Sequence, residues 1–467
     1  MSAPCRAAVR AAPLALAVAT LMLSACAGTA IDDNFGRAQQ LAQDRLGSRI
    51  RWLTSDDARQ QAQADVDAAL AQPLGADDAV RIALGYSPSL QALLFDAAAA
   101  SAGATQSARL PNPVFAFERL VRSEAGVREL EINRALSLSV LDLLLWPSRL
   151  RQAEAAQQQT RLRLAGDVAA AATTARQAWV RAVAAQQSLQ YVEQVKAAAD
   201  AGSELARRMQ AAGNFSKLQR AREQAFSADA LAQLARARQN VQSTREALVR
   251  VLGLDEARAR ALKLPPRLPD LPAAPADEQR VVQAALDDRL DLRLARANLE
   301  FTAREQGLTR VTSVVNGFDA AAVRRSETGL ASQRGFELQF PLPVFDFGDA
   351  ARTRAQATTM AAFNRLAQLA IDASSQVRER HGMYRTSYEL ARHYRDEIVP
   401  LRKTIAEENL LRYNAMVIGV FELLADSREQ IAGVVEAINA ERDFWLADAA
   451  LQATLIGAPR TLDTEPQ

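Results

Sequence analysis

The sequence predicts a mainly α-helical protein with a β-barrel portion embedded in a membrane. Three observations support this fold class: a duplication, very long helices, and two pairs of alternating strands. The duplication has an offset of about 203 residues, so that Arg149 corresponds to Arg352 and Gly213 to Met416. A repeat of this length is too large for a solenoid unit and indicates a duplicated module of helices and strands.

The predicted organisation has six parts, and a proline-rich connector separates the two copies. Its central run, residues 264–275, contains too many prolines to form a helix, so we expect it to cross the outside of the helical body. In order, the parts are a lipoprotein signal peptide at 1–25, an acylated N-terminal segment with little periodicity at 26–75, a first helix–strand–strand–helix–helix repeat at 76–252, an equatorial linker at 253–277, a second repeat at 278–457, and a C-terminal tail at 458–467.

Composition and charge narrow the possible classes of protein. The chain has 467 residues, of which 56 are basic and 54 acidic, giving a net charge of +2. This balance predicts no nucleic-acid partner. Aromatic residues make up only 5%, and the long segments are rich in alanine, leucine, glutamine and arginine, which is typical of closely packed long helices.

The first 25 residues have the pattern of a targeting segment. Arg6 and Arg10 precede a short apolar stretch from Ala11 to Leu23. Leu23-Ser24-Ala25-Cys26 then matches the bacterial lipobox, which predicts that Cys26 becomes the lipidated first residue of the mature chain. The alternative is an ordinary signal peptide with an incidental cysteine. Because Cys5 is removed with the signal, no intrachain disulfide is expected.

Two long helices are predicted by the spacing of apolar residues. No proline occurs from Leu150 to about Ala211, whereas Pro400 is expected to kink the second helix, which follows Gly348. A seven-residue apolar period indicates coiled-coil packing, and about sixty helical residues extend roughly 90 Å. Return helices are expected at about 215–252 and 418–456, before the C-terminal glycines Gly253 and Gly457. The seam positions are Leu164, Ala171, Ala178, Ala185, Val192 and Ala199, then Phe363, Ala370, Val377, Tyr384, Ala391, Ile398 and Ile405.

A pair of strands is predicted before each long helix. The first strand runs from Val114 to Val121. The second, at residues 129–138, alternates between apolar and polar residues, and Arg134 is the exception. In the second repeat, the strands are residues 313–324 and an alternating run from Phe336 to Leu342. A period of two is expected of barrel strands with lipid outside and water inside. Half-buried strands of a soluble sheet are the alternative.

The number of strands predicts a quaternary structure if the strands lie in a membrane. Four strands are too few to close a barrel, and the unpaired edge of an open sheet is costly in lipid. Three chains would supply twelve strands, an even number within the known range. The predicted assembly is therefore a trimeric 12-stranded β-barrel, four strands per chain, continued by a long coiled-coil α-helical tunnel.

Several short segments carry a family resemblance over about residues 76–457. In their order, spacing and duplication they resemble TolC-type outer-membrane efflux proteins, in the lipidated branch of that family. The segments are Ser107–Pro113 before the first strand, Phe340–Gly348 before the second long helix, the first helix break from Ala212 to Leu218, and the second break from Arg412 to Arg428.

The resemblance implies a homotrimeric channel-tunnel, lipid-anchored in the cell outer membrane and extending into the periplasm. Such a channel is the passive exit duct for an inner-membrane pump joined to it by a periplasmic adaptor protein. Such a channel has no cofactor. Besides its protein partners, it contacts outer-membrane lipid. The helix breaks are then the periplasmic tips that face the adaptor: Gly213, Asn214, Phe215 and Ser216 in the first copy, and Met416, Val417, Ile418 and Gly419 in the second.

The resemblance also implies a gate at the second tip. Tyr413 matches the position of a gate tyrosine, and Glu422 matches the first acidic position of the entrance. The second acidic position is Ala425, with Asp426 adjacent, and Met416 replaces the tip glycine. The gate candidates are therefore Tyr413, Glu422 and Asp426. The plainer alternatives are a packing tyrosine and solvated helix-surface acids.

Catalysis and metal binding have little support in the sequence. The only histidines, His381 and His393, are twelve residues apart on a predicted helix. They would lie about 18 Å apart along its axis, so surface histidines are expected rather than a metal site. Neither a metalloprotease nor a phosphate-binding motif occurs. We therefore expect no catalytic residue, no metal and no cofactor.

Two functions remain open at this point. The first is the channel component of a tripartite efflux or secretion system, with a metal, a drug or a protein as the exported substrate. The alternative is a periplasmic coiled-coil lipoprotein that acts as a scaffold without a pore. Alternating strands favour the channel, while the weak alternation of residues 313–324 favours the scaffold.

Overall fold

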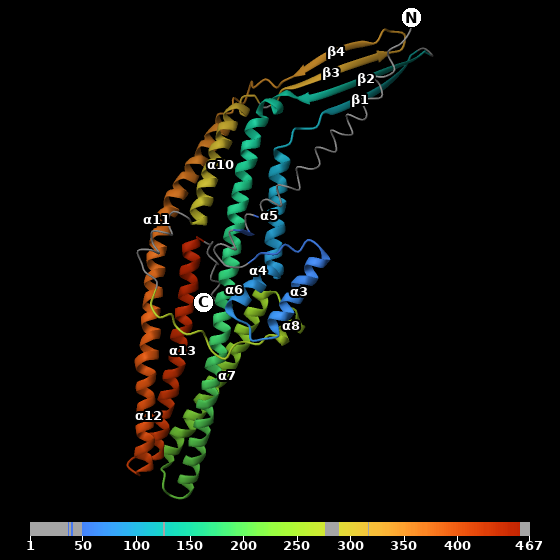
Figure 1. The fold of residues 1–467 in the computed structure, drawn as a ribbon. Helices are drawn as coiled ribbons and strands as arrows, with labels where there is room; N and C mark the ends of the chain where they lie inside the picture. The colour runs from blue at the N-terminus through green and yellow to red at the C-terminus, as the bar shows by residue number, and fades with distance from the viewer. Residues whose placement is uncertain are drawn as a thin grey trace. The chain divides into compact units, whose positions relative to one another are not determined.

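A computed structural model describes residues 36, 39, 40, 49–124, 127–275, 289–315 and 317–457 (Figure 1). The predicted signal peptide, Cys26 and the C-terminal tail lie outside the described residues, so their assignments stay predictions. Among the described helices, none combines the length and apolarity needed to cross a membrane.

The described helices and strands occur in two series of similar order. Each series contains a pair of strands, a long helix and a returning helix (Figure 1). The first comprises α3 (Asp56–Leu70), α4 (Ala76–Gly85), α5 (Pro88–Ser107), β1 (Val114–Glu124), β2 (Val127–Ser139), α6 (Val140–Ala211), α7 (Lys217–Leu252) and α8 (Glu256–Ala261). The second comprises α10 (Leu290–Thr312), β3 (Asp319–Glu327), β4 (Gln333–Gln339), α11 (Asp349–His393), the π-helical turn η1 (Tyr394–Ile398), α12 (Val399–Asn414) and α13 (Val420–Ile456).

The chain divides into two compact units. The first contains the four strands together with residues 95–164 and 291–370. The second contains the two hairpins of returning helices and the connector, within residues 39–94, 165–290 and 371–467. We describe each unit by itself.

The first unit contains one antiparallel sheet with the strand order β1-β2-β3-β4. Its register pairs Leu136 with Phe115 on one side and with Ala322 on the other. Within the described strands, β1 and β4 form the two edges and are not paired with each other. A four-stranded sheet with two open edges agrees with the predicted contribution of four strands per chain.

The strands of the second repeat differ from their predicted bounds. The strand predicted at residues 313–324 begins only at Asp319, because α10 continues to Thr312 and the following residues make helical turns. Strand β4 ends at Gln339, so the predicted alternation through Leu342 is wrong beyond that point. Pro341 and Pro343 have no N–H to donate to a ladder, which explains the early end.

The long helices also differ from prediction at two prolines. Helix α6 begins at Val140, before the proline-free stretch that starts at Leu150, and it contains Pro147, which cannot donate the hydrogen bond of its turn. Near Pro400 the expected irregularity takes the form of the π-helical turn η1, in which the Val399 N–H donates to the Tyr394 carbonyl. The wider turn removes the clash between the proline ring and the preceding carbonyl.

Helix α3 was missed within the segment predicted to have little periodicity. Ser55 caps its first turn by accepting a hydrogen bond from the Ala58 N–H, and Ala62, Val66 and Leu70 are buried at a spacing of four. Only this narrow stripe is apolar, and the rest of the helix is polar. An apolar stripe this narrow is difficult to detect by inspection.

The core of the second unit joins α11, α13 and the proline-rich connector. Tyr384 and Tyr388 of α11 pack around Phe444 of α13, with ring centroids 5.4 and 5.7 Å away. The Tyr388 hydroxyl donates to the Pro272 carbonyl, and the Trp445 indole donates to the Pro269 carbonyl. The connector is therefore held as an extended segment by side chains that satisfy its backbone carbonyls.

Candidate functional site

The first helix break, between α6 and α7, is a tight and fully capped turn. Gly213 adopts a left-handed conformation with φ of +84°, and the Asn214 N–H donates to the Met209 carbonyl. Ser216 and Gln219 then form a reciprocal capping box: each side chain bonds the other's backbone N–H, at 3.2 and 2.9 Å. These bonds satisfy donors that the start of a helix leaves unpaired.

The second break, between α12 and α13, repeats this geometry without the cap. Met416 has φ of +61°, and the Val417 N–H donates to the Arg412 carbonyl. Both positions lie 203 residues after their counterparts in the first break, so the backbone of the turn is duplicated as well as the sequence. Gly419 begins α13 without a side-chain cap, and Met416 must adopt a conformation that glycine accepts more easily.

The capping difference leads to a reciprocal pair of variants. Ser216→Ala should destabilise the start of α7 by about 1 kcal/mol, whereas Gly419→Ser should stabilise α13 by a few tenths, about 0.3 kcal/mol. The serine would complete a capping box with Glu422, three residues later. Hydrogen exchange of the first turns of α7 and α13 would measure both effects. Faster exchange at α13 in Gly419→Ser would contradict this prediction.

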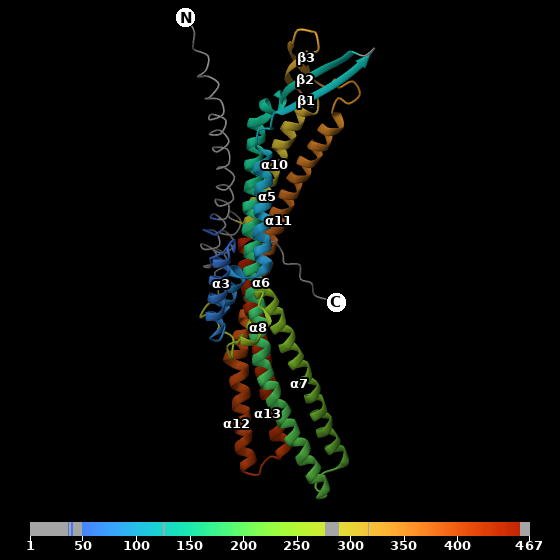
Figure 2. The same cartoon turned by 90° about the vertical axis from the view of Figure 1, so that its right-hand side faces the viewer.

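The two tips touch each other through aromatic side chains. Phe215 and Phe421 stack with ring centroids 4.5 Å apart and an interplanar angle of 20°. Figure 2 shows the hairpins of α6–α7 and α12–α13 ending at the same end of the second unit. The stack therefore links the tip of the first copy to the beginning of α13.

A largely buried ion pair ties the hairpins together above the tips. The Arg428 guanidinium of α13 donates to the Glu223 carboxylate of α7 at 2.6 Å, and their side chains are only 16% and 15% exposed. The guanidinium also lies 3.9 Å from the centroid of the Phe226 ring, within range of a cation–π interaction. Gly202 of α6 faces the pair, since a Cβ there would lie 3.0 Å from an Arg428 nitrogen. We call Gly202, Glu223, Phe226 and Arg428 the hairpin cluster.

Sequence analysis did not identify the hairpin cluster. Arg428 appeared only as the last residue of the second break in an arginine-rich chain, and Glu223 had no distinguishing pattern. Their positions differ by 205 rather than 203, so the duplication does not pair them either. Only the packing of α13 against α7 brings these side chains together.

The three gate candidates lie on the second hairpin in different environments. Tyr413 is 38% exposed at the end of α12, and Glu422 is exposed in the first turn of α13. Asp426 is half-buried and accepts a hydrogen bond from the Asn409 amide of α12. Asp426 therefore joins the two helices of its own hairpin, whereas Tyr413 and Glu422 are accessible to solvent.

Acidic residues near the first tip are held in their charged form. Arg207 and Arg208 hydrogen-bond to Glu204 and lower the pKa of its carboxyl to about 2. Hydrogen bonds from Lys196 and from Ser227 of α7 lower the pKa of the Asp200 carboxyl. The carboxylates of Glu204 and Asp200 therefore stay charged over the physiological pH range.

The two faces of the sheet in the first unit have different charges. Cross-strand partners share a face, and successive residues alternate between faces. One face, called the acidic face, carries mostly acidic residues. It also carries Arg122 and Arg325, and the Arg325 guanidinium forms an ion pair of 3.2 Å with the Glu131 carboxylate. The opposite face, the arginine face, carries large apolar residues near the helices, including Phe336, which is 81% exposed. Its basic residues are Arg119, Arg128, Arg134, Arg324 and Arg334. The acidic face contains Glu118, Glu129, Glu131, Asp319, Glu327 and Glu337.

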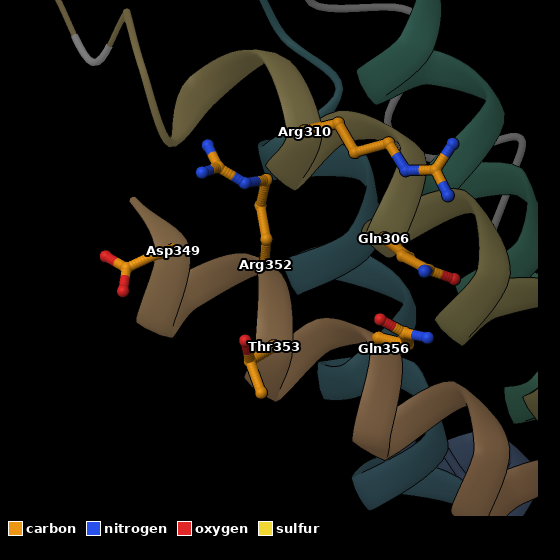
Figure 3. Close-up of a pocket in the computed structure, with 6 residues that line it drawn as sticks. All are labelled: Gln306, Arg310, Asp349, Arg352, Thr353 and Gln356. Carbon is orange, nitrogen blue, oxygen red and sulfur yellow. The ribbon is translucent and has the colours of Figure 1, made fainter. Parts of the chain in front are cut away.

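A polar pocket of about 320 Å³ lies between α10 and α11 of the first unit (Figure 3). The Arg352 guanidinium donates to the Ser313 hydroxyl at 3.3 Å and the Phe347 carbonyl at 2.8 Å. In Figure 3, Arg310 and Arg352 point in different directions, and Asp349 lies apart from both. The pocket therefore lacks the convergent groups of a catalytic site. Arg352 instead joins the start of α11 to the residue that follows α10 and to the loop before α11.

The histidines do not match the expectation that both lie on the surface. His393 is exposed and lies 3.3 Å from the Glu397 carboxylate. His381 is only 4% exposed, and its ring lies 6.3 Å from that of Tyr384. The expectation was wrong for His381, because packing buries that face of α11. Within the described part of the chain, no three His, Cys, Asp or Glu residues are grouped to hold a metal ion.

An open antiparallel sheet with oppositely charged faces and paired long hairpins defines the channel-tunnel class of fold. A membrane protein from Pseudomonas aeruginosa matches with a TM-score of 0.66 at 19% identity, over 87% of this chain and 96% of that one. The Campylobacter jejuni CmeC outer-membrane channel has a TM-score of 0.66 at 14% identity, covering 82% and 86%. The open Neisseria gonorrhoeae MtrE outer-membrane channel has 0.61 at 18% identity, covering 81% and 88%.

These likenesses confirm the TolC-type fold that the sequence resemblance predicted. No protein-family model and no curated protein matches the chain. The chain therefore shares its fold with outer-membrane channels.

Proposed function

We propose that three copies of this chain form a channel through the outer membrane and the periplasm. The four-stranded sheet carries the argument, because its open edges cannot be exposed to lipid and its two faces suit water and lipid, respectively. Closure by three copies would satisfy the edges of β1 and β4. The acidic face would then line the lumen, and the arginine face would contact lipid.

Exposed apolar residues on the long helices support the same assembly. The predicted seam residues Val377, Tyr384 and Ala391 of α11 are buried within one chain, but Phe363 and Ile405 are exposed. Large exposed apolar side chains on a long helix are typical of surfaces covered by a partner. Neighbouring copies in a closed ring would cover them.

Conductance measurements test the channel directly. Purified protein should form trimers, and these trimers should conduct ions in planar bilayers. Because the proposed lumen is acidic, the channel should favour cations over anions. Protein that remains monomeric, or trimers without conductance, would contradict this function and favour the scaffold.

The channel is proposed to be the exit duct of a tripartite efflux or secretion system. Its periplasmic tips would dock an adaptor protein that joins them to an inner-membrane pump, and a lipid on Cys26 would attach each chain to the outer membrane. The docking surface includes Met416 and Val417, which are 93% and 72% exposed at the second tip. Apolar side chains this exposed suit a protein partner. A metal or a drug is the proposed cargo.

Variants of the second tip test adaptor docking. The double variant Met416→Glu and Val417→Glu should reduce export in cells by about tenfold or more while leaving trimers intact, because burying new charges opposes docking. Ala274→Glu, in an exposed part of the connector, adds a charge away from the tips and serves as the control. Normal export by the double variant would exclude these residues from the docking surface.

The exposed carboxylate of Glu422 is the proposed cation-binding element of the gate. Glu422→Ala should weaken block of the channel by divalent cations by about tenfold, since three carboxylates would be lost from one ring. Glu436→Ala removes an exposed acid two heptads farther along α13 and should leave the block unchanged. Equal block in wild type and Glu422→Ala would remove Glu422 from the gate.

A further inference from the structure

The arginine face of the sheet has an unusual charge distribution. Among strand residues whose side chains the structure describes, it contains no acidic residue. Its five basic residues come from all four strands. They are Arg119 of β1, Arg128 and Arg134 of β2, Arg324 of β3 and Arg334 of β4.

Three of these arginines form a row across the sheet. The register places Arg134 directly opposite Arg324, and Arg324 directly opposite Arg334. Neighbouring strands are about 4.8 Å apart, so three like charges lie within about 10 Å. Like charges directly opposite one another destabilise a sheet. Each of the three side chains is exposed, which leaves the row accessible to a ligand outside the protein.

On the side of the strands that leads to the helices, the row borders an apolar surface. Toward the helices, the next row on this face is Phe115, Leu136, Ala322 and Phe336, and the one after it contains Leu138, Ala320 and Leu338. The arginine row lies two residues farther from the helices, about 7 Å along the strands. Arg119 and Arg128 lie farther still, toward the β1–β2 hairpin, together with the apolar residues Val121, Leu130 and Ile132.

This arrangement fits a lipid with an anionic headgroup. The apolar rows suit acyl chains, and charged arginines on a lipid-facing surface are tolerated near the interface rather than at the centre of the bilayer. An arginine guanidinium binds phosphate through two parallel hydrogen bonds. A phosphorylated headgroup would therefore neutralise the row while its chains cover the apolar residues.

We infer that the row of Arg134, Arg324 and Arg334 binds the phosphate groups of a phosphorylated glycolipid, of the lipid A type, in the outer leaflet. The inference rests on the proposed function, because it requires the strands to be in the outer membrane with their helices on the periplasmic side. The hairpin end of the strands then lies in the outer leaflet, where this class of lipid replaces phospholipid. Several phosphates on one headgroup match several guanidinium groups in one row.

Native mass spectrometry of the purified trimer with added diphosphorylated lipid A tests this inference. The triple variant Arg134→Gln, Arg324→Gln and Arg334→Gln should bind lipid A with an affinity at least about tenfold lower than that of the wild type. Arg324→Gln alone should weaken binding, whereas Arg325→Gln, at the next residue on the acidic face, should not. Unchanged binding by the triple variant, or an equal loss in Arg325→Gln, would overturn the inference.

A comparison of different lipids on the wild-type trimer tests the inference even if the triple variant does not assemble. Wild-type trimers should bind diphosphorylated lipid A more tightly than the monophosphorylated form or phosphatidylglycerol. Equal binding of all three would overturn the assignment to a multiply phosphorylated glycolipid. A wild-type trimer that conducts ions but does not bind lipid A would refute the inference alone, whereas absence of both trimers and conductance would refute the proposed function.

Discussion

Replacing Arg428 by alanine is expected to loosen the tips of the two hairpins and to destabilise the second unit by about 3 kcal/mol. The substitution leaves the largely buried Glu223 carboxylate without its partner, and breaking a buried ion pair in this way costs several kcal/mol. It also removes the contact with the Phe226 ring. Since the ion pair joins α7 to α13, its loss removes one of the contacts between the two hairpins, while the Phe215–Phe421 stack is retained.

Hydrogen exchange and single-channel recording would measure these effects. Amides in the last turns of α12 and the first turns of α13 should exchange faster in Arg428→Ala, and the conductance of the trimer should rise as the tips separate. Arg402→Ala is the matched control, because Arg402 pairs with Glu429 within one hairpin and their side chains are 40% and 62% exposed. Exposed pairs contribute at most about 1 kcal/mol. Equal effects of the two variants would show that the hairpin cluster has no special role.

Replacing Gly348 by alanine is expected to destabilise the proposed trimeric β-barrel strongly. Gly348 has φ of +70°, and a Cβ at this position would lie 2.3 Å from the Ser313 carbonyl oxygen. The left-handed conformation costs an L-residue about 1–2 kcal/mol, and forcing atoms into a packed site costs about 1–3 kcal/mol more. The end of α10 must therefore move away from the start of α11.

A second glycine separates the steric effect from the conformational one. Gly329, in the turn between β3 and β4, has φ of +82°, but a Cβ there would meet no atom within 4 Å. Gly329→Ala should therefore cost only about 1–2 kcal/mol. The temperature at which half of the purified trimers dissociate would compare the variants. A Gly348→Ala trimer as stable as the Gly329→Ala trimer would show that the corner between α10 and α11 adapts to the methyl group.

Local patterns predicted much of the secondary structure. A strand-like run from Val114 to Val121 located β1, and alternation of apolar and polar residues located β2. The left-handed glycines Gly253 and Gly457 end the return helices as expected. The same approach misplaced β3 and missed α3. Apolar residues at helical spacing continue through the end of α10, and the apolar stripe of α3 is too narrow to stand out. In both cases, a helical spacing was present in the sequence but was too weak to be recognised by inspection.

The candidate sites were predictable only where they depend on the local chain. The positions of the tips could be predicted from the sequence, because a turn glycine and a capping serine mark the first tip and the duplication marks the second. Burial of His381 and the hairpin cluster depends on which helix faces which, and a single sequence does not contain that information directly. The pattern of β2 singled out Arg134 as an exception, but nothing in the sequence showed that Arg324 and Arg334 lie beside it.

The sequence by itself determined the two copies, the long helices, the four strands and the positions of the breaks. These features depend on spacings of two, about four and seven residues within one segment, which the covalent chain displays directly. Only the tertiary structure decided the partners: Glu223 for Arg428, Phe421 for Phe215, and the row of three arginines on one face of the sheet. Strand register and helix packing are set by contacts between residues far apart in the chain, and a shift of one residue in register would have moved every side chain of a strand to the opposite face.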